Sequence, residues 1–133
     1  MVPVLADTHA ALWFMQDDAR LSGAARAALD GADETGVGIY LSAISLIEVT
    51  YLVEKGRLSQ GVLARLEADL DDSNGIFVLV PIDRAVAAAV ASVPLAEVRD
   101  LPDRVIAATA RFLGMPLVTA DAQLRRSSVE TIW

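Results

Sequence analysis

The chain has 133 residues, of which 54% are hydrophobic, so its length and composition suit one globular domain with a sizeable core. The net charge is −7, with ten arginines and one lysine, which argues against a protein that binds nucleic acid through a broad basic face. The chain contains no cysteine, and this excludes a disulfide framework and a thiolate metal site.

Mean hydropathy is high at +0.45, yet no apolar run approaches the roughly 18 residues that a membrane span needs. The start of the chain lacks the basic residues and the small-residue cleavage site of a signal peptide. No linker, repeat or low-complexity tract interrupts the sequence. We therefore expect a cytoplasmic protein, not associated with a membrane, in which residues 1–133 form one domain.

Short apolar runs alternate with helical patterns along the chain. Strands are expected at 2–6, 38–42, 76–82, 117–119 and 129–132. Helices are expected at 10–17, 23–31, 43–55, 59–72, 83–92 and 103–113, with a short one from about 121. Gly31, Gly36 and Gly38 mark a loop, and the charged segment before Asp103 marks another. Strands that alternate with helices imply an α/β fold with a parallel sheet covered on both faces.

Four acidic residues fall where this topology brings chain segments together: Asp7, Glu48, Asp103 and Asp121. Ligands of parallel sheets bind beyond the carboxyl ends of the strands, and Asp7 and Asp121 follow strands at that edge. Several carboxylates that meet in one pocket can hold a hard divalent cation. Without the cation, mutual repulsion should raise some of their pKa values. The pattern points to metal-assisted phosphodiester chemistry.

A structural interpretation competes with this one for three of the acids. Asp7, Asp103 and Asp121 each precede a predicted helix, so N-capping alone explains any one of them. Glu48 is different, because its predicted helix is apolar nearly all round, and such a helix is usually buried. With no basic residue on the same helix face, we favour a ligand or pocket acid for Glu48.

Hydroxyl side chains accompany the acids in the sequence. Thr8, Ser45 and Thr119 either orient the carboxylates or metal-bound waters, or are ordinary hydroxyls at element ends. The single histidine, His9, cannot form a typical zinc site in a chain without cysteine, and a backbone contact at the helix start is its simpler interpretation. Trp13 is most simply a core residue.

Charged residues also surround Asp103. Asp100 is either a solvated surface charge or an auxiliary acid. Arg99 and Arg104 flank the predicted pocket, where they either hold phosphate or form ion pairs with Asp100 or Asp103.

Segments along the whole chain resemble PIN-domain ribonucleases, and specifically the toxin subunit of VapBC-type toxin–antitoxin pairs. They are LADTHAALWFMQDDARLS, SAISLIEVTYLVEKGRL, RDLPDRVIAATARFLGMPLVTAD and the closing VETIW. The resemblance implies a three-layer α/β/α sandwich with a central parallel sheet of about five strands. It also implies dependence on Mg²⁺ or Mn²⁺ and endonucleolytic cleavage of a specific RNA.

Carried over residue by residue, the resemblance makes Asp7, Glu48, Asp103 and Asp121 the expected metal ligands and catalytic residues. Thr8 and Thr119 match the usual hydroxyl neighbours of these acids. The segment Leu101-Pro102, and Val98 where histidine is common, depart from the subgroup pattern on the substrate side. The implied partners are an RNA substrate, a small antitoxin and a second copy of the chain.

Other functions are compatible with the same fold class. A catalytically silent PIN-fold binding module is one, and another metal-dependent nuclease or RNA-processing protein is a second. A response-regulator receiver would need a lysine late in the chain, but the one lysine is Lys55. A phosphatase with an aspartate nucleophile would need a second acid where His9 stands.

Overall fold

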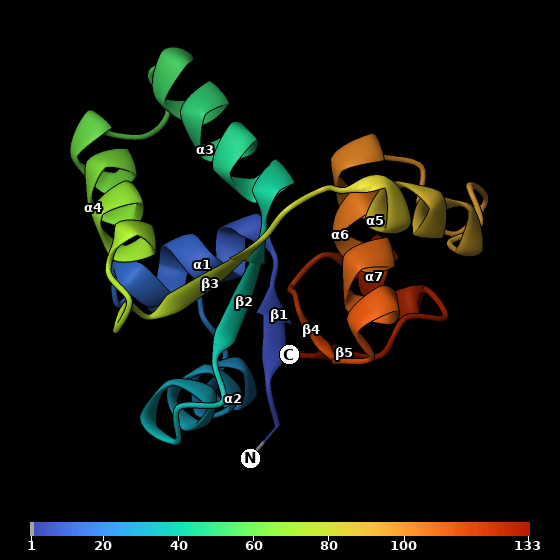
Figure 1. Cartoon of the computed structure of the whole chain (residues 1–133), viewed down its shortest axis with the longest axis horizontal. Coiled ribbons are helices and arrows are strands. Elements are labelled where there is room, and N and C mark those ends of the chain that lie inside the picture. The colour runs from blue at the N-terminus through green and yellow to red at the C-terminus, as the bar shows by residue number, and fades with distance from the viewer. Residues whose placement is uncertain (1) are drawn as a thin grey trace.

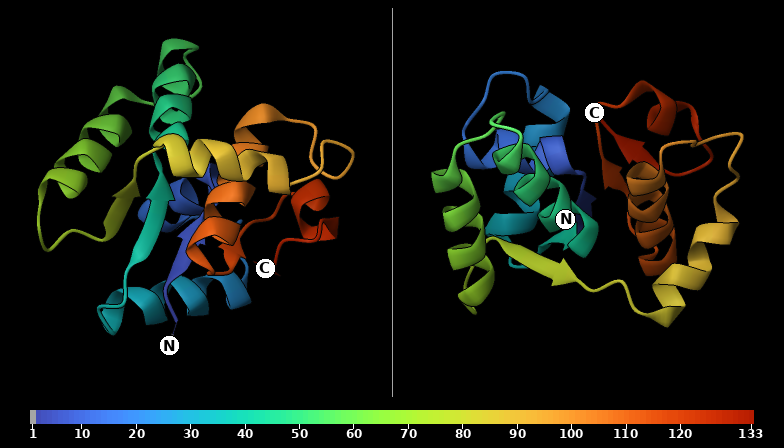
Figure 2. Two further views of the ribbon diagram at one scale, coloured as in Figure 1. Left: turned by 45° about the vertical axis from the view of Figure 1, so that its right-hand side comes forward. Right: turned by 90° about the horizontal axis from the view of Figure 1, so that it is seen from above.

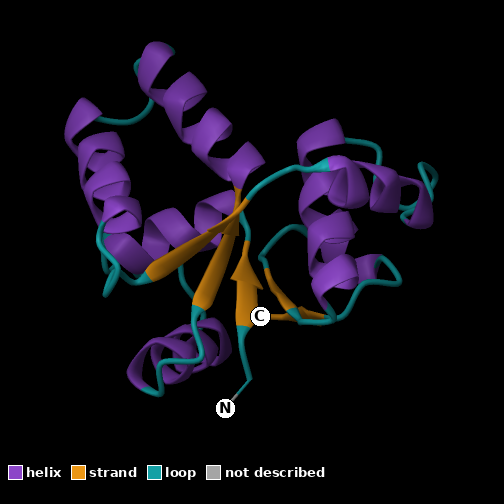
Figure 3. Ribbon diagram, in the orientation of Figure 1, coloured by secondary structure: helices purple, strands orange, loops and turns teal. Residues whose placement is uncertain are grey.

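The computed structural model describes residues 2–133, and its centre is a five-stranded parallel sheet with the strand order β3–β2–β1–β4–β5 (Figure 1). The strands are β1 (Val4–Ala6), β2 (Ile39–Ser42), β3 (Phe77–Val80), β4 (Leu117–Val118) and β5 (Thr131–Ile132). The helices are α1 (Thr8–Met15), α2 (Gly23–Glu34), α3 (Ala43–Glu54), α4 (Gln60–Asp71), α5 (Arg84–Ala89), α6 (Leu101–Leu113) and α7 (Ala122–Arg126), with a 3₁₀ turn, η1 (Val90–Ser92). Figure 3 shows how these helices surround the sheet.

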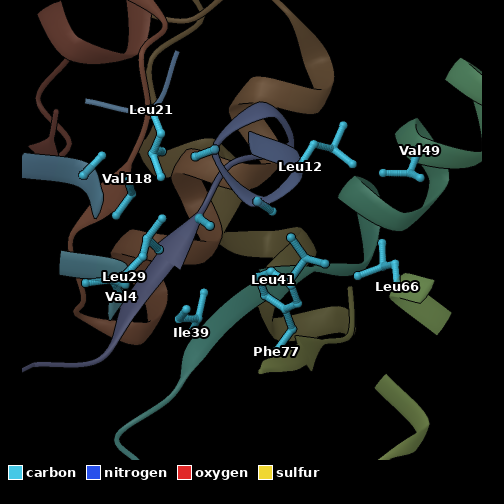
Figure 4. Packing of buried hydrophobic residues seen from close by; sticks show 14 of the residues in the cluster. Val4, Leu12, Leu21, Leu29, Ile39, Leu41, Val49, Leu66, Phe77 and Val118 are labelled. Atoms are coloured by element: carbon cyan, nitrogen blue, oxygen red, sulfur yellow. The ribbon is translucent and has the colours of Figure 1, made fainter. Parts of the chain in front are cut away.

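Side chains of β1 alternate between two cores, because successive residues of a strand point to opposite faces. Val4 and Ala6 belong to a cluster that includes residues of α1, α2 and α4 (Figure 4). Leu5 belongs to a second cluster, which contains Ile106 of α6 and Leu124 of α7. Seen from above, α5 and α6 lie across the sheet from α4 (Figure 2). The predicted α/β/α layering is confirmed.

The register of the sheet decides which loops meet. Ala6, the last residue of β1, pairs with Leu41 of β2 and with Val118 of β4. All three strands run in the same direction, so the residues that follow Ala6 and Val118 emerge side by side at the carboxyl edge. These residues are Asp7 and Thr119.

Several predicted element boundaries were wrong. α2 continues to Glu34, so Gly31 lies inside the helix, and the loop glycines with positive φ are Gly36 and Gly38. α6 begins at Leu101 with Asp100 as its N-cap, two residues before the predicted start. The charged segment before Asp103 suggested a loop there, but part of it forms the first turn of α6, where Pro102 is tolerated because its missing N–H has no partner to lose.

The prediction that α3 is buried nearly all round was also wrong. Ile47 and Tyr51, one turn apart, are 59% and 55% exposed. α3 rises from the carboxyl end of β2 and projects away from the sheet (Figure 1), so the sheet covers only part of it. Among residues 2–133, no helix combines the length and the apolar character that a membrane crossing requires.

The entry to β3 depends on one carboxylate. Asp69, near the end of α4, accepts hydrogen bonds from the backbone N–H groups of Ile76 at 2.7 Å and Phe77 at 2.9 Å. The chain passes so close that a Cβ added at Gly75 would lie 2.1 Å from the Asp69 carbonyl oxygen. Glycine is therefore required at this turn for steric reasons.

We predict that Gly75→Ala lowers the free energy of unfolding by about 1–3 kcal/mol, the range typical of an overpacked position. The matched control is Gly23→Ala at the start of α2, where an added Cβ meets no atom within 4 Å. Gly23→Ala should be neutral or stabilising by up to about 1 kcal/mol. Urea denaturation of both variants checks this, and equal effects would contradict the steric explanation.

Candidate active site

A cavity of about 240 Å³ opens at the carboxyl edge of the sheet. It is lined by Asp7, Thr8, His9, Glu48, Asp100, Asp103 and Asp121. The four acids predicted from the sequence, together with Thr8 and Asp100, therefore border one space, although they come from the ends of β1 and β4, from α3 and from the start of α6.

Asp7 is the most buried of these acids, with an exposed fraction of 7%. Its Oδ1 accepts the backbone N–H of Ala10 at 2.8 Å, which caps α1, and its Oδ2 accepts the Thr119 hydroxyl at 2.5 Å. Thr119 in turn accepts the backbone N–H of Asp121 at 3.0 Å. Thr119 therefore links two of the acids and fixes the orientation of Asp7.

Glu48 lies half-buried on α3, and a residue of α1 forms a hydrogen bond with its carboxylate. The Thr8 hydroxyl donates to Glu48 Oε1 at 2.6 Å, and it lies 2.9 Å from the hydroxyl oxygen of buried Ser45. These contacts place Thr8 and Ser45 beside the acids, as expected from the sequence. Thr8 follows Asp7 directly, so one short segment of chain contacts the carboxylates of β1 and α3.

The structure shows which of these acids are helix N-caps and which are not. Asp121 caps α7 through a hydrogen bond from Leu124 N–H at 2.9 Å. At α6 the cap is Asp100, whose Oδ2 accepts the N–H of Asp103 at 3.1 Å, so the interpretation of Asp103 as an N-cap was wrong. Asp103 lies within the first turn of α6, half-buried at the cavity. Capping therefore does not explain Asp103 or Glu48.

Three of the acids hold their protons more tightly than ordinary carboxyl groups. Burial raises the pKa of Asp7, and burial followed by the negative charges of Asp100 and Asp7 raises the pKa of Glu48. The pKa of Asp103 is raised to about 7, first by burial and then by repulsion from the surrounding carboxylates. The predicted direction is confirmed, and burial is its largest cause.

The donor set suits a hard divalent cation, because every acid offers carboxylate oxygen and the chain has no thiolate. Within residues 2–133, however, no three acidic or histidine side chains stand close enough together to hold one ion as they are placed. Instead, the carboxylates of Asp7, Glu48 and Asp121 each accept a hydrogen bond from a backbone N–H or a hydroxyl group of the protein. A cation held by three of these acids at once therefore requires at least one carboxylate to change its rotamer.

The two predicted phosphate ligands differ. The Arg104 guanidinium donates to the carbonyl oxygens of Val90 at 3.1 Å and Val93 at 2.9 Å, so it ties η1 to α6 and is a structural residue. Its assignment to RNA phosphate is not supported. Arg99 is exposed, and its backbone N–H donates to Gln123 Oε1 at 3.2 Å. Across the described part of the chain neither arginine forms an ion pair with Asp100 or Asp103.

Sequence reasoning missed an aromatic border of the site. A second cavity, of about 260 Å³, is lined by Asp7, His9, Trp13, Ala120 and Asp121, and it shares three residues with the acid cavity. The available signal was the spacing of His9 and Trp13, four residues apart on the helix that follows Asp7 and therefore on one helix face.

A larger cavity, of about 510 Å³, lies away from these acids and is lined by residues of α1, α2, α4 and β3. Its Asp69 is committed to backbone N–H groups, and its Asp17 forms an ion pair with Arg26 at 2.9 Å. The carboxylates of the acid cavity repel one another instead. We therefore place the chemistry at the acid cavity.

Comparison with known proteins agrees with this fold. Residues 4–129 match the family model of the PIN domain. The chain is 37% identical over 127 residues to ribonuclease VapC22 of Mycobacterium tuberculosis, which covers 94% of this chain and 92% of that protein. This chain belongs to the PIN-domain family and is VapC-like within that family.

Solved structures show the same fold at lower sequence identity. A chain in the crystal structure of VapBC2 from Rickettsia felis, bound to a promoter DNA fragment, matches with a TM-score of 0.72 at 15% identity and covers 98% of this chain and 97% of its own. A chain in the crystal structure of FitAcB from Neisseria gonorrhoeae matches with a TM-score of 0.66 at 24% identity, with coverages of 96% and 95%.

We predict that Asp103→Asn stabilises the metal-free protein at pH 8 but not at pH 4. The unfolded carboxyl group releases its proton near pH 3.8 and the folded one near pH 7. Its contribution to stability is therefore lost as the pH rises between these values. Asparagine cannot ionise, so at pH 8 the gain should be on the order of 1 kcal/mol after allowance for solvent screening.

Urea denaturation in the presence of a chelator measures this difference. Asp33→Asn, which changes an exposed acid on α2, is the matched control and should have the same effect at both pH values. The electrostatic account would be wrong if Asp103→Asn were less stable than the wild type at pH 8.

Proposed function

We propose that this protein is a metal-dependent endoribonuclease toxin that cleaves a specific RNA. The observation that carries the proposal is the meeting of Asp7, Glu48, Asp103 and Asp121 at one cavity on the carboxyl edge of a PIN-type sheet. A purely structural site would not be expected to collect carboxylates that raise one another's pKa values. The ribonuclease name of the 37% identical relative supports the same activity.

In this proposal, Asp7, Glu48, Asp103 and Asp121 hold Mg²⁺ or Mn²⁺. When bound, such a cation lowers the pKa of a coordinated water and stabilises negative charge on phosphate oxygens. Thr119 keeps Asp7 oriented, and Thr8 does the same for Glu48. In the metal-free protein, the carboxyl group of Asp103 can hold or release a proton near neutral pH, and a bound cation would favour its deprotonated form. Asp100 lies beside Asp103 and adds negative charge to the cavity.

The substrate in this proposal is a particular RNA rather than nucleic acid in general. The net charge of −7 weakens loose binding that depends on phosphate contacts alone. Recognition should then depend on the shape of the RNA and on its unpaired bases. Arg99, exposed beside the cavity, remains the candidate for a phosphate contact.

We further propose that the chain forms a homodimer and is inhibited by a small antitoxin. The VapBC and FitAB complexes among the structural neighbours support this arrangement. Exposed apolar side chains support it as well, since Ile47, Tyr51 and Leu101 are each more than half exposed. A silent binding module remains the alternative function, and a metal titration distinguishes the two because only the enzyme needs the cation.

We predict that Asp7→Asn reduces RNA cleavage at least a hundredfold and leaves the fold intact. Asparagine is as good an N-cap as aspartate, so the hydrogen bond from Ala10 can persist while the charge is lost. The measurement is sequencing of RNA 5′ ends after induced expression. Wild type and the control Asp33→Asn should create new ends at defined positions. A well-folded Asp7→Asn variant with full activity would contradict the assignment.

We predict that Mg²⁺ or Mn²⁺ raises the melting temperature of the wild type. A ligand that binds only the folded state stabilises it by about 2.7 kcal/mol at a concentration one hundred times its Kd. The shift should disappear in the double variant Asp7→Asn, Asp103→Asn. Calorimetric scans with and without millimolar metal test this, and the prediction fails if the double variant shows the same shift as the wild type.

A further inference from the structure

The cavity of about 260 Å³ that contains Trp13 lies beside the acid cavity. We call it the aromatic pocket, and its lining is Asp7, His9, Trp13, Ala120 and Asp121. Three of these residues, Asp7, His9 and Asp121, also line the acid cavity, so the two cavities are neighbours. Its volume of about 260 Å³ is several times the roughly 30 Å³ that a water molecule occupies in the liquid, so it can take a larger group.

Trp13 is supported on several sides. The His9 and Trp133 rings each lie 5.8 Å from the Trp13 ring between centroids, tilted by 45° and 58°. The Arg20 guanidinium lies over Trp13 at 5.0 Å from the ring centroid, and Asp18 holds Arg20 through an ion pair of 2.7 Å. Trp13 is therefore a fixed ring that is only half-buried and borders a cavity.

This arrangement differs from ordinary core packing. A core tryptophan is covered by apolar side chains on all sides, whereas Trp13 packs against the apolar core and also borders a cavity that it shares with two of the acids proposed to hold the cation. A group that occupies the pocket is therefore adjacent to the place where a scissile phosphate would lie. The carboxylates of Asp7 and Asp121 disfavour a second phosphate there, whereas an uncharged, flat group meets no such repulsion and can stack on the half-buried ring of Trp13.

We propose that the aromatic pocket binds one unpaired nucleobase of the RNA substrate, next to the phosphate that is cleaved, with the face of the Trp13 ring that Arg20 leaves uncovered as its stacking surface. Unpaired bases of RNA stack on aromatic side chains, and each base has a π-face that such a ring can contact. The inference rests on the proposed ribonuclease function and adds a base-binding site to it. The substrate must then be single-stranded at the cleavage position.

The binding test uses the non-cleaving background Asp103→Asn, because Asp103 does not line the aromatic pocket. Fluorescence anisotropy in Mg²⁺ compares labelled single-stranded RNA tetranucleotides with an abasic tetramer that carries the same phosphates. The base-bearing RNA should bind about tenfold more tightly than the abasic one. Trp13→Leu should remove this difference, and Trp13→Phe should retain most of it.

Two further variants separate base stacking from general damage. Phe112→Leu removes an aromatic ring that is 51% exposed near the other end of α6, and it should leave the tenfold difference unchanged. His9→Ala alters an exposed side chain of the pocket, so it tests the site if Trp13→Leu does not fold. It should reduce the difference about threefold.

In the cleaving protein, Trp13→Leu should raise KM for single-stranded RNA about tenfold and change kcat less than twofold. Equal binding of base-bearing and abasic RNA, or equal effects of Trp13→Leu and Phe112→Leu, would overturn the pocket assignment and leave the proposed ribonuclease intact. If the wild type cleaves no RNA while binding still depends on the base, the proposed function fails and the pocket stands.

Discussion

The crowding of carboxylates at the end of β1 is the constraint to which the rest of the site is adjusted. Asp7 must remain where the sheet places it, because Ala6 is fixed between Leu41 and Val118. Its carboxylate is nearly removed from water, and its neighbours are further acids. Burying charge in this way costs free energy unless hydrogen bonds or a cation compensate.

The surrounding polar residues supply part of that compensation. Thr119 donates to Asp7 and accepts the N–H of Asp121, while Thr8 donates to Glu48. These hydroxyls carry no charge, so they orient the carboxylates without neutralising them. No arginine or lysine of the described chain forms an ion pair with the four acids, since the two ion pairs found there join Arg20 to Asp18 and Arg26 to Asp17. The remaining repulsion favours a divalent cation.

Much of this arrangement was predictable from the sequence, because it depends on local patterns. Alternating strands and helices predicted the parallel sheet, and the position of Asp7 after a strand predicted its place at the carboxyl edge. The sequence predicted burial of Glu48 because its helix is apolar nearly all round, and that reason was wrong. α3 is not enclosed, and Glu48 is shielded instead by α1 through Thr8.

Other features depend on contacts between distant segments and have no local signature. The sequence places Arg104 beside Asp103, yet its guanidinium turns to the carbonyl groups of Val90 and Val93. The sequence alone suggested a core position for Trp13. The aromatic pocket forms because the turn after β4, with Ala120 and Asp121, approaches Trp13, while Trp133 and Arg20 contact the Trp13 ring. The charged segment before Asp103 suggested a loop where Asp100 in fact caps a helix.

The central claim is that acids from separate elements share one hard cation. Anomalous diffraction from crystals grown with Mn²⁺ tests it most directly, because the metal itself is located. The account predicts a Mn²⁺ peak in the acid cavity, with coordinating oxygens from Asp7 and from at least one of Glu48, Asp103 and Asp121. A cavity without Mn²⁺ at saturating concentration, or Mn²⁺ bound only at acids outside it, would contradict the account.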